Sequence, residues 1–176
     1  QRRFGAESSG DVSLFTAPGR TEMGGNHTDH QHGRVLAGSV SMDMVACAGP
    51  NNSHWIRVAS QGYPEVAVNL DDLEYKPDEE GTSAALVRGV AAALAERGHE
   101  LSGFSASVSS TVPGGAGLSS SAAYEILIGV IFNRLSCGDA ISPVELAQIG
   151  QFAESQYFGK PCGLLDQMAC SIGGVV

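Results

Sequence analysis

Short runs in which apolar and polar residues alternate dominate the first part of the chain, and this period is that of half-buried strands. Two such runs cover residues 12–16 and 34–48, the second broken at Gly38 and at a turn formed by Met42 and Asp43. Residues 17–33 between them are rich in glycine and histidine, so we expect a long loop there.

Two further strands are expected over residues 55–60 and 65–69, because both are rich in β-branched residues. The residues 60–63, Ser-Gln-Gly-Tyr, join them and favour a hairpin. Another alternating run covers residues 103–111. Together these runs predict a largely antiparallel β region.

Three helices are predicted in the second part of the chain. Residues 83–97 are rich in alanine, with Thr82 as a suitable N-cap and Gly98 as the stop signal. Two more are expected over 119–134 and from Pro143, a natural first-turn residue, to about Tyr157.

Length and composition describe an ordinary globular domain. The 176 residues are 43% hydrophobic and 16% charged, which is enough for a single core, and no apolar run is long enough to span a bilayer. The net charge of −9 and the presence of only two lysines, Lys76 and Lys160, argue against nucleic acid as a partner. We therefore expect a protein that binds neither nucleic acid nor membrane.

The four cysteines are scattered, with no Cys-x-x-Cys pair and no zinc spacing, so we expect buried thiols in a reducing, cytoplasmic protein. They are Cys47, Cys137, Cys162 and Cys170. Residues 1–5 contain no starting Met and lead into no apolar segment. We therefore expect no secretory signal, and a chain that is part of a longer protein.

A glycine-rich turn over residues 111–123 runs from a predicted strand into a predicted helix. Glycines allow the backbone to approach an anion, and the first turn of the helix offers free N–H groups, so the segment suits phosphate binding. It lacks the lysine of a Walker loop and the glycine spacing of a dinucleotide fold. The alternative is a flexible turn with Ser119 as a simple helix cap. Three successive serines favour the first interpretation, since a helix needs only one cap.

The loop over residues 17–30 combines an arginine, carboxylates and imidazoles. Such a set can bind a polyol through directed hydrogen bonds. Two alternatives are a metal site formed by His27, His30 and His32, and an ordinary surface loop.

Two acidic residues near the end of the chain complete the candidate chemistry. Asp166 lies in an otherwise apolar run, where a carboxylate is either a satisfied structural group or a reactive one. Glu154 lies in a predicted helix, where it could be either a solvated charge or a metal ligand.

Residues 113–122 resemble the ATP-binding motif of the GHMP kinases, the superfamily of galactokinase, homoserine kinase, mevalonate kinase and phosphomevalonate kinase. The family pattern is Pro-x-Gly-x-Gly-Leu, then Ser or Gly, then Ser-Ser-Ala. The resemblance implies that the ATP phosphates are bound by Pro113, Gly114, Gly115, Ala116, Gly117, Leu118, Ser119, Ser120 and Ser121. It also implies that Ser121 and Glu154 are the two protein ligands of Mg²⁺.

Residues 19–30 resemble the galactokinase signature Gly-Arg-Val-Asn-Leu-Ile-Gly-Glu-His-Thr-Asp-Tyr. The resemblance makes Arg20 the catalytic arginine and makes His27 and Asp29 sugar contacts. Asn26 stands where the family usually has a Glu that binds a sugar hydroxyl, so the hydrogen-bonding capacity is kept and the charge is lost.

Residues 162–167 resemble the galactokinase motif Cys-Gly-Ile-Met-Asp-Gln. The resemblance makes Asp166 the base, with a pKa lowered by Arg20, and gives Gly163 a backbone contact with the sugar.

The family implies an α+β fold similar to the second domain of ribosomal protein S5, with a mixed or antiparallel sheet packed against helices. Residues 1–176 would be its N-terminal domain, which binds sugar and ATP, and the family's third glycine-rich motif and ferredoxin-like C-terminal domain are missing. We therefore expect this piece alone to be inactive or nearly so.

The implied activity is transfer of the γ-phosphate of ATP to the anomeric hydroxyl of galactose, with Mg²⁺. Alternatives are a kinase for another sugar, such as N-acetylgalactosamine, arabinose or a uronic acid, and a non-catalytic sugar sensor. The dipeptide Ser121-Ala122, which is lost in the known sensor, is present here.

Overall fold

The computed structural model describes residues 11–176. The residues 1–5 on which the expected absence of a signal depends lie outside this range. The described elements are β1 (Ser13–Gly24), η1 (Thr28–Gln31), β2 (Leu36–Pro50), β3 (Trp55–Ser60), β4 (Val66–Asn69), η2 (Pro77–Glu79), α1 (Ser83–Glu96), β5 (Phe104–Ser110), α2 (Ser120–Leu135), α3 (Pro143–Gln156) and α4 (Leu165–Ile172).

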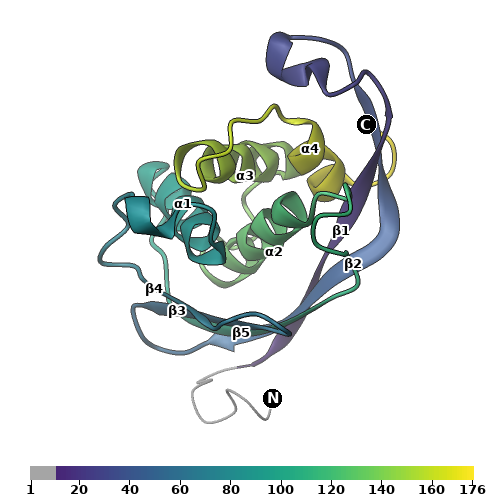
Figure 1. Cartoon of the computed structure of the whole chain (residues 1–176). Coiled ribbons are helices and arrows are strands. Elements are labelled where there is room, and N and C mark those ends of the chain that lie inside the picture. Colours follow the sequence, from purple (N-terminus) through teal and green to yellow (C-terminus); the bar gives the residue numbers. More distant parts are fainter. Residues whose placement is uncertain (1–10) are drawn as a thin grey trace.

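The strands form one mixed sheet in the order β1-β2-β5-β3-β4. All neighbours are antiparallel except β3 and β5, which run parallel. The predicted hairpin is confirmed as the antiparallel pair β3 and β4. Figure 1 shows the α-helices on one face of this twisted sheet, with β1 and β2 extending past them and carrying η1 at their far end. The α+β fold expected from the sequence is therefore confirmed.

The core lies between the sheet and the helices. Inward-facing residues of the strands, such as Ile56 and Phe104, meet apolar residues of α1 and α2, such as Leu94 and Phe132. The rings of Phe104 and Phe132 pack edge to face with centroids 5.0 Å apart, the arrangement that aromatic quadrupoles favour. Helices α1 and α3 approach closely at Gly89, where an added Cβ would lie 2.8 Å from Ala153.

The predicted loop over residues 17–33 was wrong in its first part, because β1 continues to Gly24. Pairing with β2 supplies the backbone hydrogen bonds that the sequence pattern could not reveal. The predicted turn at Met42 and Asp43 was also wrong, since β2 is continuous there. A register shift between the Pro18–Asp43 and Arg20–Ser39 pairs accommodates the irregularity as a bulge.

The three predicted helices are confirmed, with ends that differ by at most one residue. Thr82 caps α1, its side chain accepting a hydrogen bond from the N–H of Ala85. Ser142 and Glu145 form a capping box at the start of α3, where Pro143 occupies the first turn. Helix α4 was missed, because it is short and begins after Leu164, which makes no side-chain cap.

Two expectations from composition bear on the described residues. The four cysteines are free, but only Cys170 is buried, and Cys47, Cys137 and Cys162 are half-buried. Among residues 11–176, no helix has the length and apolar character needed to cross a membrane.

Candidate active site

Arg20 connects three parts of the molecule from a buried position on β1. Its backbone N–H donates to the carbonyl of Leu118 at 3.1 Å, and its Nη1 donates to the carbonyl of Gly117 at 2.7 Å. Its Nε donates to Asp166 Oδ1 at 2.6 Å. The arginine therefore fixes the glycine-rich turn and the carboxylate of Asp166 relative to each other.

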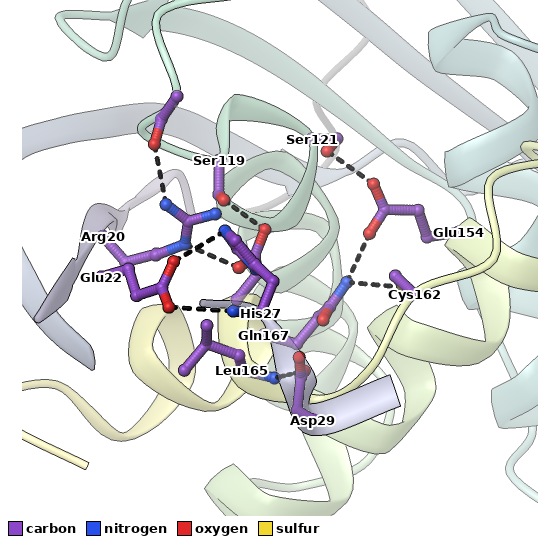
Figure 2. Close-up of polar contacts among 12 residues, drawn as sticks. Arg20, Glu22, His27, Asp29, Ser119, Ser121, Glu154, Cys162, Leu165 and Gln167 are labelled. Carbon is purple, nitrogen blue, oxygen red and sulfur yellow. Dashed lines mark hydrogen bonds and ion pairs between the residues drawn. The ribbon is translucent and has the colours of Figure 1, made fainter. Parts of the chain in front are cut away.

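The glycine-rich turn enters α2 through a left-handed residue. Ser119 has φ 54° and ψ 56°, and its side chain makes no capping hydrogen bond. Its hydroxyl donates instead to Asp166 Oδ2, and Figure 2 shows this bond beside the Arg20 guanidinium. A serine costs energy in this backbone conformation, so the rest of the site must hold it there. The alternative of Ser119 as a simple helix cap was wrong.

Asp166 lies in the first turn of α4, and its side chain is 16% exposed. Burial by itself raises the pKa of Asp166, but the hydrogen bonds from Arg20 and Ser119 outweigh it, and the pKa lies below its ordinary value. The carboxyl is therefore ionised at neutral pH. Its two oxygens are both held, which fixes the orientation of the group at the cavity that it lines.

Ser121 and Glu154 meet as the family resemblance led us to expect. The Ser121 hydroxyl, in the first turn of α2, donates to Glu154 Oε1 at 2.8 Å, and Glu154 is fully buried on α3. The other oxygen of Glu154 accepts from Gln167 Nε2 at 2.7 Å (Figure 2). A carboxylate that is buried and anchored in this way is not the solvated helix charge that was the alternative.

Gln167 and Glu125 were not identified as site residues from the sequence. Gln167 also donates to Glu125 Oε2 at 3.1 Å, so one amide joins the carboxyl groups of α2 and α3. Burial raises the pKa of Glu125 well above its ordinary value, and the charge of Glu154 raises it further. The Oε1 atoms of Glu125 and Gln167 have no hydrogen-bond partner. A proton on Glu125 turns one of these acceptors into a donor, which agrees with a neutral carboxyl.

Lys160 was also missed as a site residue. Its Nζ donates to Glu154 Oε1 at 2.8 Å, although its side chain is 57% exposed. Nothing in the sequence around Lys160 indicated this contact, because the loop after α3 reverses the chain at Gly159, where φ is 81°.

The predicted sugar contacts lie where β1, η1 and the segment before α4 meet. Asp29 Oδ2 accepts from the N–H of Leu165 at 2.9 Å, and a side chain at Gly163 would collide with the Asp29 carboxylate. His27 is held by Glu22, which accepts from its backbone N–H at 2.9 Å and pairs with its Nε2 at 3.1 Å (Figure 2). Glu22 is therefore another site residue that the sequence did not reveal.

A cavity of about 620 Å³ brings most of the predicted residues together. Its walls include Arg20, His27, Asp29, Gly115, Gly117, Ser119, Ser120, Ser121, Gly163 and Asp166. A second cavity of about 330 Å³ is lined by Gly114 and by aromatic residues, and it shares Ser120, Ser121 and Phe158 with the first. Five predicted residues line neither: Asn26, Pro113, Ala116, Leu118 and the fully buried Glu154. The alternative metal site at His27, His30 and His32 gains no support, since no three His, Cys, Asp or Glu side chains within residues 11–176 are grouped to hold a metal ion.

The site thus combines a glycine-rich turn at a helix start with an arginine that joins it to a fixed carboxylate, an arrangement that suits the binding of a phosphate group. A family model described as "GHMP kinases N terminal domain" matches residues 85–174, about half of the chain, and the chain therefore belongs to the GHMP kinase family. A second model, "Galactokinase galactose-binding signature", matches residues 1–50.

Several of the proteins that this chain resembles are galactokinases. The galactokinase of Streptomyces coelicolor is 36% identical over 94% of this chain and 42% of its own length. The crystal structure of Lactococcus lactis galactokinase complexed with galactose is 30% identical, with a TM-score of 0.88 over 98% of this chain and 45% of that one. Methanococcus jannaschii mevalonate kinase is 18% identical with a TM-score of 0.78 over 95% of this chain and 53% of its own, which shows the shared fold. The chain spans less than half the length of the curated galactokinases it matches.

Proposed function

We propose that the protein containing this chain transfers the γ-phosphate of ATP to the anomeric hydroxyl of galactose. The observation that carries the proposal is the double contact of Arg20, which joins the glycine-rich turn to Asp166 in one cavity. The similarity to galactokinases over more than nine-tenths of the chain supports galactose as the substrate.

The ATP phosphates would lie against the glycine-rich turn and the start of α2. Free backbone N–H groups and the positive end of the α2 dipole suit an anion there. The adjoining cavity of about 330 Å³ is the candidate site for the purine base, since Tyr63, Tyr124 and Phe158 offer aromatic surfaces around it.

Ser121 and Glu154 would hold Mg²⁺. A hydroxyl and a carboxylate are ligands that Mg²⁺ accepts, and it completes its coordination with water and phosphate oxygens. The Lys160 ammonium bonded to Glu154 supports a cation position at this carboxylate. When bound there, Mg²⁺ would neutralise charge on the phosphates.

Asp166 would accept the proton of the anomeric hydroxyl. As the sugar oxygen forms its bond to the γ-phosphorus, the bond to the bridging oxygen of ADP breaks and the proton passes to an oxygen of Asp166. A carboxylate of lowered pKa is a weak base. This suits phosphoryl transfer, in which bonding to the nucleophile is slight in the transition state and the proton leaves late. Arg20 would stabilise the developing charge.

The deciding experiment measures phosphoryl transfer by the purified full-length protein against a panel of sugars. Asp166→Asn should lower kcat by about 100-fold or more with galactose. Asp139→Asn is the matched control, because it breaks another Asp–Arg pair whose side chains are both more than half exposed. ATP turnover that does not depend on sugar, or an Asp166→Asn protein as active as the wild type, would overturn the proposal.

A further inference from the structure

Lys160 contacts Glu154 through both its backbone and its side chain. Its backbone N–H donates to the Glu154 carbonyl at 3.0 Å, just beyond the end of α3. Its Nζ donates to Glu154 Oε1 at 2.8 Å. The backbone bond fixes the base of the side chain, so the ammonium group can leave the carboxylate while Lys160 itself stays beside the cavity.

Two donors share one oxygen of Glu154. Oε1 accepts from Lys160 Nζ and from the Ser121 hydroxyl, both at 2.8 Å, while Oε2 is engaged by Gln167. The Glu154 side chain is 0% exposed. An ionised carboxylate in such a position needs a counter-charge, and the Lys160 ammonium supplies it.

The contacts of Ser121 and Lys160 involve the atoms that a metal ion at this site would use. A cation bound to Ser121 Oγ and Glu154 Oε1 needs lone pairs on both oxygens, and Oε1 now directs its own toward two donors. An ammonium and a divalent cation on one oxygen also repel each other strongly. The metal ion and the Lys160 ammonium therefore cannot occupy Oε1 together.

We propose that Lys160 is a built-in counter-ion that occupies the metal position of the metal-free protein and is displaced when the divalent cation binds. The inference rests on the proposed metal site of Ser121 and Glu154. Displacement requires only a side-chain movement, because the Lys160 side chain is more than half exposed and its ammonium group lies at the end of four flexible methylene groups. Lys160 would thereby stabilise the empty site and weaken metal binding.

Metal binding tests the competition directly. Mn²⁺, titrated alone into the full-length protein and followed by paramagnetic resonance, should bind about tenfold more tightly to Lys160→Met, since no charge-assisted hydrogen bond has to be broken. Lys160→Arg keeps a cation and should retain weak binding. Lys76→Met is the control, because Lys76 pairs with Asp72 four residues earlier, outside this site. Unchanged or weaker binding by Lys160→Met would overturn the inference.

Thermal unfolding in EDTA supplies a second readout that does not depend on activity. Lys160→Met should lower the unfolding midpoint of the metal-free protein, and it should lose this effect when Glu154→Gln is already present. Equal effects in both backgrounds would contradict the counter-ion role.

Glu154→Gln separates the two proposals. If it leaves Mn²⁺ binding unchanged, the proposed metal site is wrong. If it weakens Mn²⁺ binding while Lys160→Met fails to strengthen it, the metal site stands and the displacement is wrong.

Discussion

The Ser119 hydroxyl donates to the Asp166 carboxylate and not to the helix that Ser119 precedes. The residue takes the left-handed conformation to reach it, with φ 54°. Ser119 therefore connects the start of α2 with the start of α4, beside the parallel contact that Arg20 makes to the same carboxylate. The hydrogen bonds from Arg20 on β1 and from Ser119 in the glycine-rich turn thus orient the Asp166 carboxylate and keep it ionised.

Substitution of Ser119 separates its chemical role from its backbone conformation. Ser119→Ala and Ser119→Gly both remove the hydrogen bond to Asp166, so each should lower kcat by about 10- to 100-fold. Only glycine relieves the left-handed conformation, and Ser119→Gly should be more stable than Ser119→Ala by about 1 kcal/mol. Steady-state kinetics and urea unfolding measure the two effects. Equal stability of the two variants would show that the backbone at Ser119 is unstrained.

Local sequence patterns predicted the helices and strands better than the tertiary contacts between them. The helix that begins after Thr82 was found from its cap and spacing, and β3 was found at its observed bounds, because both depend on neighbours in sequence. The continuation of β1 to Gly24 depends on pairing with β2, and the contact of Lys160 with Glu154 depends on the reversal at Gly159. Those features require the tertiary structure.

The sequence indicated the candidate site as separate motifs. The family order suggested that Ser121 and Glu154 act together, and their contact agrees with that. The supporting residues Glu22 and Gln167 were not found, because a carboxylate or an amide that positions a neighbour has no sequence signature of its own.

Gly163 is expected to control sugar binding through Asp29. A Cβ in Gly163→Ala would collide with the Asp29 carboxylate and displace it from the N–H of Leu165. The KM for galactose should rise about tenfold or more, because small displacements of a binding group are costly. Binding of a fluorescent ATP analogue should be unchanged. Gly24→Ala is the control, since an added Cβ there meets nothing within 4 Å. An unaltered KM in Gly163→Ala would remove Asp29 from the sugar site.

Asn26 is expected to set the affinity for galactose. Asn26→Glu would supply a carboxylate acceptor for a sugar hydroxyl, and the KM for galactose should fall severalfold. The change should also cost about 1 kcal/mol of stability, since Asn26 has φ 52° and Asn tolerates this conformation better than Glu. Kinetics across a sugar panel, together with urea unfolding, measure both effects.

Asn52 provides the control for that substitution. It is also left-handed, with φ 51°, but it lies between the end of β2 and the start of β3, at the opposite end of β2 from the loop that carries Asn26. Asn52→Glu should therefore cost similar stability and leave the KM for galactose unchanged. If Asn26→Glu also leaves the KM unchanged, position 26 does not contact the sugar.

The raised pKa of Glu125 should make the folded protein less stable as the pH rises. Its pKa is raised in the folded protein well above the unfolded value of 4.5, so the folded state binds more protons than the unfolded state between these two values. The free energy of unfolding must then fall with pH in that window, by up to about 1.4 kcal/mol for each pH unit. Glu125→Gln cannot ionise, and its stability relative to the wild type should increase from pH 5 to pH 8 in urea unfolding.

Glu145→Gln is the contrasting variant for this experiment. The hydrogen bonds from Ser142 lower the pKa of Glu145, so its stabilising effect is already complete above an unfolded value of 4.5 and is lost only as the pH falls below it. The difference between Glu145→Gln and the wild type should therefore stay constant from pH 5 to pH 8. A constant difference for Glu125→Gln as well would mean that Glu125 is ionised in the folded protein. The amide of Gln167 would then donate to two charged carboxylates, and the single positive charge of Lys160 would have to offset both negative charges.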